Sequence, residues 1–143
     1  MSGGVGRTEE SKALYRRITD EIWSTGRLDL VDELVDRHLV DHVDLPGLTG
    51  AGRDRYRASV QMVREAFPDY HEEILWLVAD GDLAAAYVRS TGTHRGPLYG
   101  IPPTGRRATF HSMGALRFAG GRAVERWGMG DSAELLLQLG ISP

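Results

Sequence analysis

The stretch ILWLVADGDLAAAYVRSTG, residues 74–92, decides the fold class because it changes the period of the apolar residues. Upstream the apolar spacing is that of helices, whereas here it becomes a period of two on either side of the turn DGD. The first half is apolar at both sets of alternate positions. Ile74, Trp76 and Val78 form one set, and Leu75, Leu77 and Ala79 form the other. We therefore predict a strand covered on both faces, and a returning strand whose Ala and Gly residues leave room on one face.

The sequence before this stretch predicts three helices. The segment TEESKALYRRITDEIWSTG begins at Thr8, a typical N-cap residue, and repeats Leu14, Ile18 and Ile22 at four-residue spacing. The segment RLDLVDELVDRHL, residues 27–39, has a second, shorter apolar stripe and is predicted to be helical too. The third helix follows in RDRYRASVQMVREAFPDY and is expected to end before the proline of that segment.

The sequence after this stretch predicts a hairpin and a closing helix. The segments ATFHSMGALRF and AVERWGMG flank the turn AGG, and DSAELLLQLG follows them. Because the helices precede the strands, the sequence favours an α+β fold with a largely antiparallel sheet and argues against alternating βαβ units. With 143 residues, the chain is expected to form one domain, 1–143, with residues 1–7 as a flexible tail.

Composition excludes several classes of function. A formal net charge of −3 provides no general attraction to nucleic acid or to an anionic membrane surface. The absence of cysteine excludes disulfides, thiolate nucleophiles and cysteine-ligated zinc. The start MSGGVGRTEE lacks the apolar segment of a signal peptide, and no apolar run approaches the ~20 residues that span a bilayer. We therefore expect a cytoplasmic protein.

Two segments resemble the SnoaL-like polyketide cyclases of the nuclear transport factor 2-like superfamily. They are VADGDLAAAYVRSTGTHRGPLYGIPPTGRRATF and ERWGMGDSAELLLQLG, and the likeness extends over nearly the whole chain. The resemblance implies a cone-shaped α+β barrel, in which a curved antiparallel sheet is wrapped by the N-terminal helices around an apolar pocket. It also implies ring closure of a hydrophobic, polyketide-like substrate by intramolecular aldol condensation, without a metal or organic cofactor.

The same resemblance assigns the acid/base role to Asp131. A single carboxyl group can mediate both proton transfers of an aldol closure if its pKa lies near the operating pH. The sequence DSAE is equally typical of a helix start, in which Asp131 caps the helix and Glu134 reaches back to it. Both roles remain open at this stage.

Residues near Asp131 are the candidate substrate contacts. Trp127 and Met129 share its parity along the strand, so they are expected to form the cavity wall, although core packing explains them equally well. His111 lies on the neighbouring strand, where it would assist Asp131 if its side chain faces the same cavity. His42 is expected at the pocket mouth.

His38 and His42 lie four residues apart, a metal-site spacing on a helix, but no third ligand is evident, so we predict no metal site. Arg89 is expected either to pair with a carboxylate at the rim or to contact substrate. Limonene-type epoxide hydrolases share the implied fold and use an Asp–Arg–Asp arrangement. Thr91 stands where the second carboxylate would be needed, which argues against that activity.

Two classes of function therefore remain: an acid/base cyclase and a non-catalytic protein that binds a hydrophobic small molecule. A desolvated carboxyl group with a nearby proton donor in the pocket favours catalysis. The apolar outer face of the sheet predicts a homodimer or higher homo-oligomer.

Overall fold

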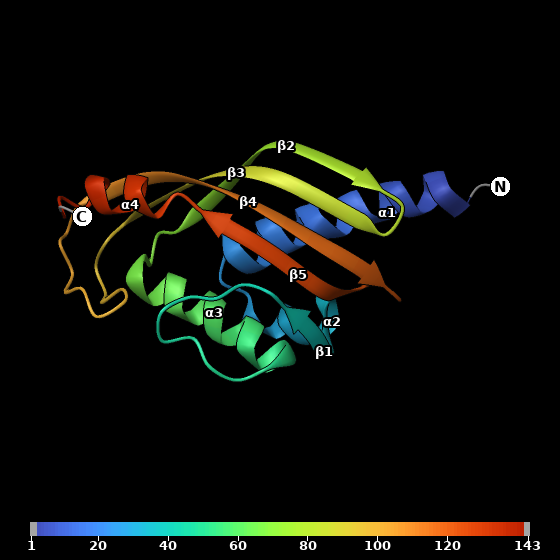
Figure 1. Ribbon diagram of the computed structural model, residues 1–143, viewed down its shortest axis with the longest axis horizontal. Helices are drawn as coiled ribbons and strands as arrows, with labels where there is room; N and C mark the ends of the chain where they lie inside the picture. Colours follow the sequence, from blue (N-terminus) through green and yellow to red (C-terminus); the bar gives the residue numbers. More distant parts are fainter. Residues whose placement is uncertain (1–2, 142–143) are drawn as a thin grey trace.

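Helices packed on one face of a five-stranded sheet form an α+β fold, which the computed structural model describes for residues 3–141 (Figure 1). The helical elements are α1 (Gly3–Arg17), the π-helix η1 (Ile18–Trp23), the 3₁₀-helix η2 (Leu28–Leu30), α2 (Val31–Leu34), α3 (Gly52–Ala66) and α4 (Ser132–Gln138). The strands are β1 (Val35–Asp41), β2 (His71–Asp80), β3 (Leu83–Thr93), β4 (Arg107–Ala119) and β5 (Arg122–Gly130). The predicted α+β class is confirmed.

The sheet has the order β1-β5-β4-β3-β2. Consecutive strands from β2 to β5 pair antiparallel, whereas β1 pairs parallel with β5, so the sheet is mixed at one edge. β1 and β2 are the two edges, so the sheet forms an open cone rather than a closed barrel.

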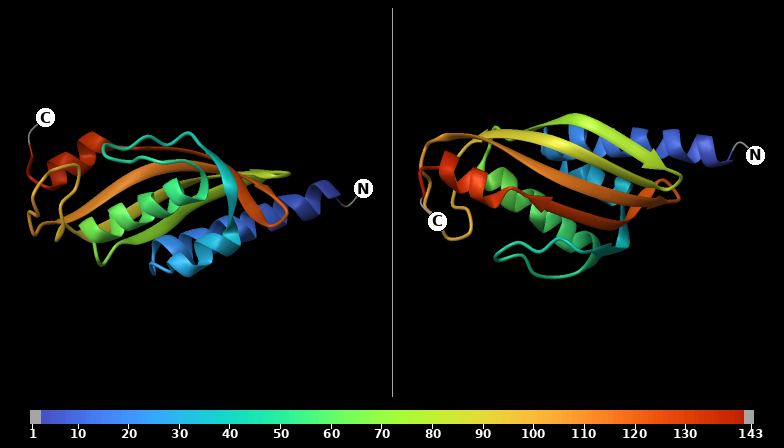
Figure 2. Two further views of the ribbon diagram at one scale, coloured as in Figure 1. Left: turned by 90° about the horizontal axis from the view of Figure 1, so that it is seen from below. Right: turned by 45° about the horizontal axis from the view of Figure 1, so that its top comes forward.

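The helices cover a single face of the sheet, which we call the inner face. Figure 2 shows α1 and α3 on this side, with α4 at the end of the sheet opposite the start of α1. The main core lies between the two layers and includes Ile22, Val31, Val60, Ala84 and Ala86, all with 0% exposure. A smaller cluster near α4 contains Phe67 and Leu139.

The first predicted helix is confirmed, although it starts earlier and changes its form. α1 begins at Gly3, so it includes part of the segment 1–7 for which a flexible tail is expected; residues 1 and 2 lie outside the described part. The chain then continues as the π-helix η1, which buries Ile18 and Ile22.

The helix predicted for residues 27–39 is wrong in its second half. Only η2 and the single turn α2 are helical, and the chain then extends as β1. Val35 and Leu39 are both buried, and their four-residue spacing resembles helical periodicity. The strand accommodates this spacing because its register with β5 shifts between Val35 and Val40. Parallel pairing with β5, a contact distant in sequence, overrides the local pattern.

A register shift in β2 also changes the predicted parity of the strand. Ile74 pairs with Val88, but Trp76 pairs with the next residue, Tyr87, so Leu75 is the extra residue of a bulge. Ile74 and Leu77 consequently both pack on the core, whereas Trp76 stacks on Tyr87 on the opposite face.

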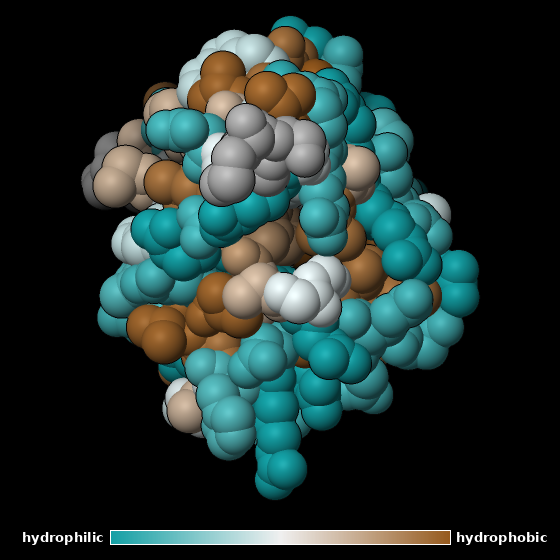
Figure 3. Space-filling view, turned by 90° about the vertical axis from the view of Figure 1, so that its right-hand side faces the viewer, coloured by the Kyte–Doolittle hydropathy of each residue, from teal (hydrophilic) through white to brown (hydrophobic). Residues whose placement is uncertain are grey.

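The outer face of the sheet is not covered by this chain within residues 3–141. Its exposed apolar side chains include Trp76, Val78, Met113 and Met129, with exposed fractions from 43% to 78%. The expected cover on both faces of β2 is therefore absent from the isolated chain. Figure 3, a view from the end at which α1 begins, shows brown hydrophobic groups gathered in patches between teal hydrophilic ones.

Candidate functional site

A cavity of about 420 Å³ lies between the inner face of the sheet and the helices. Its volume falls within the range of about 300–1,000 Å³ that is typical of small-molecule sites. Aromatic and apolar side chains line most of it, among them Tyr15, Ile18, Trp23, Tyr56, Tyr70, Val88, Phe110 and Leu135. This site could admit a small to medium, mainly hydrophobic ligand.

Glycines on the inner face of the sheet make room for the cavity. Gly114 on β4 faces Gly128 on β5 across the ladder, and both line the cavity. A Cβ atom at Gly114 would lie 2.7 Å from the Tyr15 hydroxyl, and one at Gly128 would lie 3.2 Å from a Val43 methyl group. These positions therefore lack a side chain because the helix and the loop approach the sheet closely.

Three tyrosines bring hydroxyl groups to the cavity. Burial raises the pKa of Tyr15, raises that of Tyr56 to about 12 and raises that of Tyr70 well above its usual value. The Tyr56 hydroxyl accepts a 2.7 Å hydrogen bond from Trp23 Nε1, and the Tyr70 hydroxyl lies 2.9 Å from Ser90 Oγ. All three phenols therefore stay protonated at neutral pH and can act as hydrogen-bond donors.

Glu72 is the ionisable carboxyl group that the cavity desolvates. Burial raises its pKa to about 8; the negative charge of Asp20 adds to this effect, and a hydrogen bond from Tyr70 opposes it. Its place on β2 is directly opposite the fully buried Ser90 on β3. At neutral pH the group is therefore mainly a neutral carboxylic acid.

Sequence reasoning missed Glu72. The available signal was parity, because Glu72 lies two residues before Ile74, whose side chain packs on the core. In the sequence HEEIL it resembles a solvated strand end, and nothing local distinguishes it from the exposed Glu73.

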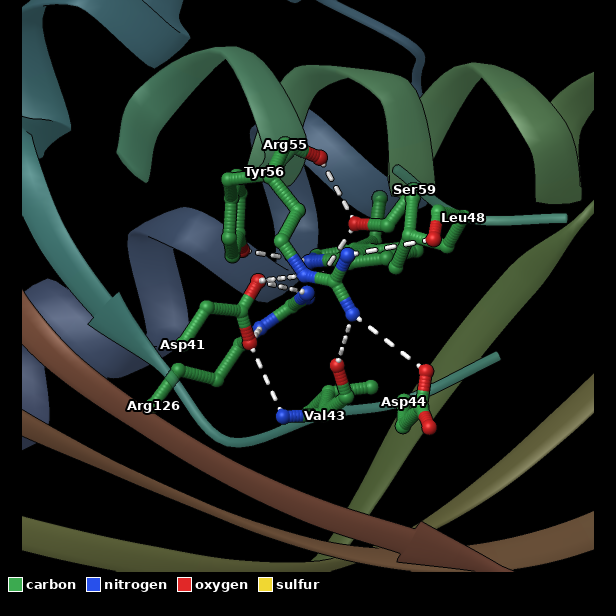
Figure 4. Close-up of polar contacts among 9 residues, drawn as sticks. Asp41, Val43, Asp44, Leu48, Arg55, Tyr56, Ser59 and Arg126 are labelled. Carbon is green, nitrogen blue, oxygen red and sulfur yellow. Dashed lines mark hydrogen bonds and ion pairs between the residues drawn. The ribbon is translucent and has the colours of Figure 1, made fainter. Parts of the chain in front are cut away.

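Arg126 reaches the cavity from β5, where it forms a buried ion pair with Asp41 on β1. Its Nε and Nη2 atoms lie 2.9 and 2.6 Å from the two carboxylate oxygens (Figure 4). The guanidinium also donates to Ser59 Oγ at 3.2 Å and lies 4.5 Å from the ring centroid of Tyr56. The side chains of Arg126 and Asp41 are 8% and 2% exposed, so the pair joins β5, β1 and α3 inside the protein.

Arg55 on α3 holds the loop that covers one side of the cavity. Its Nη2 atom donates to the Val43 carbonyl at 2.8 Å and its Nη1 atom donates to the Leu48 carbonyl at 3.2 Å (Figure 4). It also lies 3.5 Å from the carboxylate of Asp44. Val43 and Asp44 line the cavity, so Arg55 fixes part of its wall.

Asp131 is the N-cap of α4 and lies among the residues that line the cavity. Its Oδ1 atom accepts a 2.9 Å hydrogen bond from the Glu134 backbone N–H, as the capping pattern predicts. The reciprocal bond from the Glu134 side chain is not formed, because the Asp131 N–H donates to the His111 carbonyl and the Glu134 carboxylate binds His111 instead.

His111 faces away from the cavity. β4 positions that line the inner face, such as Gly114, have the opposite parity, and the His111 ring stacks on Tyr87 of the outer face at 5.5 Å. Its Nδ1 atom lies 2.9 Å from Glu134 Oε1. His111 therefore ties the start of α4 to the sheet rather than meeting a ligand in the cavity.

The side chains of Trp127 and Met129, which were expected to form the cavity wall, also lie on the outer face. The register pairs Trp127 with Ala115 and Met129 with Met113, opposite in parity to the inner Gly128. Both residues border the cavity, but the Met129 side chain is 78% exposed. Parity along β5 identified the residues that share a face, but not which face of the sheet the helices cover.

His42 and Arg89 belong to the outer face as well. The His42 ring stacks on Trp127 at 5.2 Å, and its Nε2 atom lies 2.7 Å from Glu125 Oε2. Arg89 forms the expected ion pair with a carboxylate, Glu73, at 3.2 Å. Neither side chain meets the cavity, so the Asp–Arg–Asp arrangement considered for Arg89 has no support there.

Residues 3–141 contain no cluster of three or more His, Asp or Glu side chains that could hold a metal ion. His38 lies on β1 rather than on a helix, so the four-residue spacing to His42 is not the helical spacing of a metal site. Within the same range, no helix is long and apolar enough to span a membrane.

Comparisons with known proteins agree with this architecture. The model of the family described as SnoaL-like polyketide cyclase matches residues 13–139. Nogalonic acid methyl ester cyclase of Streptomyces nogalater is 29% identical over 119 residues, which cover 82% of this chain and 89% of the relative.

Solved structures have the same fold. IdmH of Streptomyces antibioticus, for which a polyketide cyclase activity is proposed, has a TM-score of 0.79 and 27% identity, over 92% of this chain and 99% of that chain. AclR of Streptomyces galilaeus, for which a hydroxylase activity is proposed, has a TM-score of 0.81 and 27% identity, over 95% of this chain and 84% of that chain.

The open α+β cone and its cavity define a class of proteins in which one face of the sheet and the N-terminal helices enclose a cavity of small-molecule size. Within that class, the chain belongs to the SnoaL-like polyketide cyclase family.

Proposed function

We propose that the protein closes a ring in a hydrophobic, polyketide-like substrate by cofactor-independent acid/base catalysis, an intramolecular aldol condensation. The observation that carries the proposal is a mainly apolar cavity of about 420 Å³ that holds a desolvated carboxyl group beside phenolic hydrogen-bond donors. A purely structural or binding role gives no reason to bury an ionisable group without a cation beside it, because burial disfavours the charged form.

Asp131 is the proposed base. It lines the cavity, and its backbone N–H is fixed to the sheet through the His111 carbonyl. The Asp131 carboxylate removes a proton from an activated carbon of the substrate, and that carbon attacks a carbonyl carbon of the same molecule. His111 acts as a positioning residue, because its contacts with Glu134 hold the start of α4 in place.

The reaction is tested with the substrate class of a relative. Nogalonic acid methyl ester is incubated with the purified protein, with and without a strong chelator, and products are separated by liquid chromatography with mass detection. We expect an isomer of unchanged mass and shifted retention, formed at the same rate with chelator present.

The second candidate, a non-catalytic binding protein, predicts a different result. In that case the ester quenches tryptophan fluorescence in a saturable manner, yet no isomer forms above the rate of a protein-free control. Binding without turnover would therefore overturn the cyclase proposal and support the binding role. If the ester is neither bound nor converted, it is excluded both as a substrate and as a ligand.

A further inference from the structure

Glu72 differs from the other carboxylates that line the cavity. Asp44 is almost fully exposed and lies beside Arg55, and Asp131 caps α4. Glu72 instead lies on β2, at the strand position opposite the buried Ser90 of β3. Its carboxyl group therefore serves neither a surface ion pair nor a helix cap.

The surroundings of Glu72 do not supply a free cation. Arg126 is the basic group that lines the cavity, and its guanidinium is occupied by the bidentate pair with Asp41. The titratable groups that interact with Glu72 are Asp20 of η1 and three tyrosines, Tyr15 of α1, Tyr56 of α3 and Tyr70 before β2. Three of these are neutral phenols, and Asp20 repels a second negative charge.

The Tyr15 hydroxyl is a second donor at the same place. It lies 2.7 Å from the position that a Cβ atom would take at Gly114 on β4. The Tyr56 and Tyr70 hydroxyls each have a hydrogen-bond partner, whereas the Tyr15 hydroxyl makes no hydrogen bond within the described residues. Tyr15 can therefore donate to a ligand oxygen that lies beside Glu72.

We propose that Glu72 is the general acid of the cavity, which protonates the carbonyl oxygen of the substrate while Tyr15 donates a hydrogen bond to that oxygen. This role rests on the proposed ring closure and assigns its second proton transfer. Without Glu72, Asp131 would have to remove a proton from one atom of the substrate and deliver a proton to another.

The step balances without an oxidant or a co-reactant. The base takes a proton from the nucleophilic carbon, and the electron pair of that C–H bond forms the new C–C bond. The π electrons of the attacked carbonyl move to its oxygen, which takes the proton of Glu72. Glu72 is left as a carboxylate and regains a proton from water, while the base loses one, so the net reaction is an isomerisation.

The protonation state of Glu72 is measured directly by infrared difference spectroscopy of the parent and Glu72→Gln. We expect a protonated carboxyl band in the parent at pH 7 that is absent from Glu72→Gln and disappears near pH 8, the value to which burial raises the pKa of Glu72. A parent without this band at pH 7 would overturn the assignment, whether or not the protein turns over substrate.

Kinetics test the role in the reaction. Glu72→Gln preserves shape and hydrogen bonding but cannot transfer a proton, so we expect kcat to fall about 100- to 10,000-fold with KM changed less than about threefold. The parent should lose activity above about pH 8, where Glu72 ionises, and the variant should lack this alkaline limb. The matched control is Glu73→Gln, the same change one residue along on the outer face, which should retain the parent kcat.

The outcomes separate the two proposals. An active parent whose Glu72→Gln variant keeps full kcat and the alkaline limb would overturn the general acid alone. A folded parent that forms no isomer from the ester would overturn the proposed ring closure of this substrate, and with it this assignment of its acid. Circular dichroism of both variants confirms that the comparison is made between folded proteins.

Discussion

The ionisation of Glu72 makes the stability of the protein depend on pH, in addition to its proposed activity. Below about pH 4.5 the carboxyl group is protonated in both the folded and the unfolded chain. Between about pH 4.5 and pH 8 the unfolded chain releases the proton while the folded protein keeps it, so unfolding becomes progressively more favourable. Relative to Glu72→Gln, we expect the parent to lose up to about 5 kcal/mol of unfolding free energy across this window, as an upper bound.

Urea denaturation of both proteins at pH 5 and pH 8.5 measures this effect. The informative quantity is the difference between parent and variant at each pH, because the other titrating groups are shared. A difference that stays constant with pH would mean that Glu72 ionises in the folded protein as it does in the unfolded chain.

Asp131 combines a structural and a proposed catalytic role, which two substitutions separate. Asp131→Asn keeps an oxygen that accepts from the Glu134 N–H, so we expect a change in stability well under the ~1 kcal/mol that Asp131→Ala should cost. Neither variant can transfer a proton, so turnover should fall about 100- to 10,000-fold in both. Melting temperature and turnover are measured on the same samples. Full activity of the Asn variant would leave Asp131 as a cap only.

The Asp41–Arg126 pair joins three elements, so we expect its loss to affect the whole sheet edge. Asp41→Ala leaves the buried guanidinium without its carboxylate and should cost about 3–5 kcal/mol in denaturant titrations. Removing both charges, in Asp41→Ala with Arg126→Met, should cost less than the single change because no uncompensated charge remains. Glu73→Ala, which breaks an exposed pair, is the control and should have a much smaller effect. Equal losses for the two single variants would contradict a buried, uncompensated charge.

At the scale of the whole molecule, residues 3–141 leave the outer face of the sheet open, and we expect a second copy to cover it. Aromatic and methionine side chains lie there without cover from this chain's helices, including Trp76, Tyr87, Met113 and Met129. Light scattering after size exclusion, at micromolar concentration, should give about twice 15.8 kDa. Met129→Asp should shift the protein to the monomer because it places a charge in the interface.

The control for this prediction is Val5→Asp. Val5 is as exposed as Met129 but lies on α1, so its substitution should leave the dimer intact. A parent that elutes as a monomer would exclude the interface, and equal effects of both substitutions would place it elsewhere.

The sequence by itself indicated the family and the order of most elements, with β1 as the exception. Alternating residues predict β2 to β5, and the four-residue spacing predicts α1 and α3, because each pattern follows from the geometry of a single element. The capping role of Asp131 was predictable for the same reason, since its partner N–H lies three residues away.

Only the tertiary structure decided which side chains meet in the cavity. β1 replaced the end of a predicted helix because it pairs with β5, which lies about 85 residues later in the chain. The bulge at Leu75 reversed the parity of the second half of β2. Glu72 and Arg126 face inward because the helices cover the face of the sheet to which their strand positions point, whereas Trp127 points to the other face. The pattern of one strand fixes which residues share a face, but which of its two faces is covered depends on helices that pack from elsewhere in the chain.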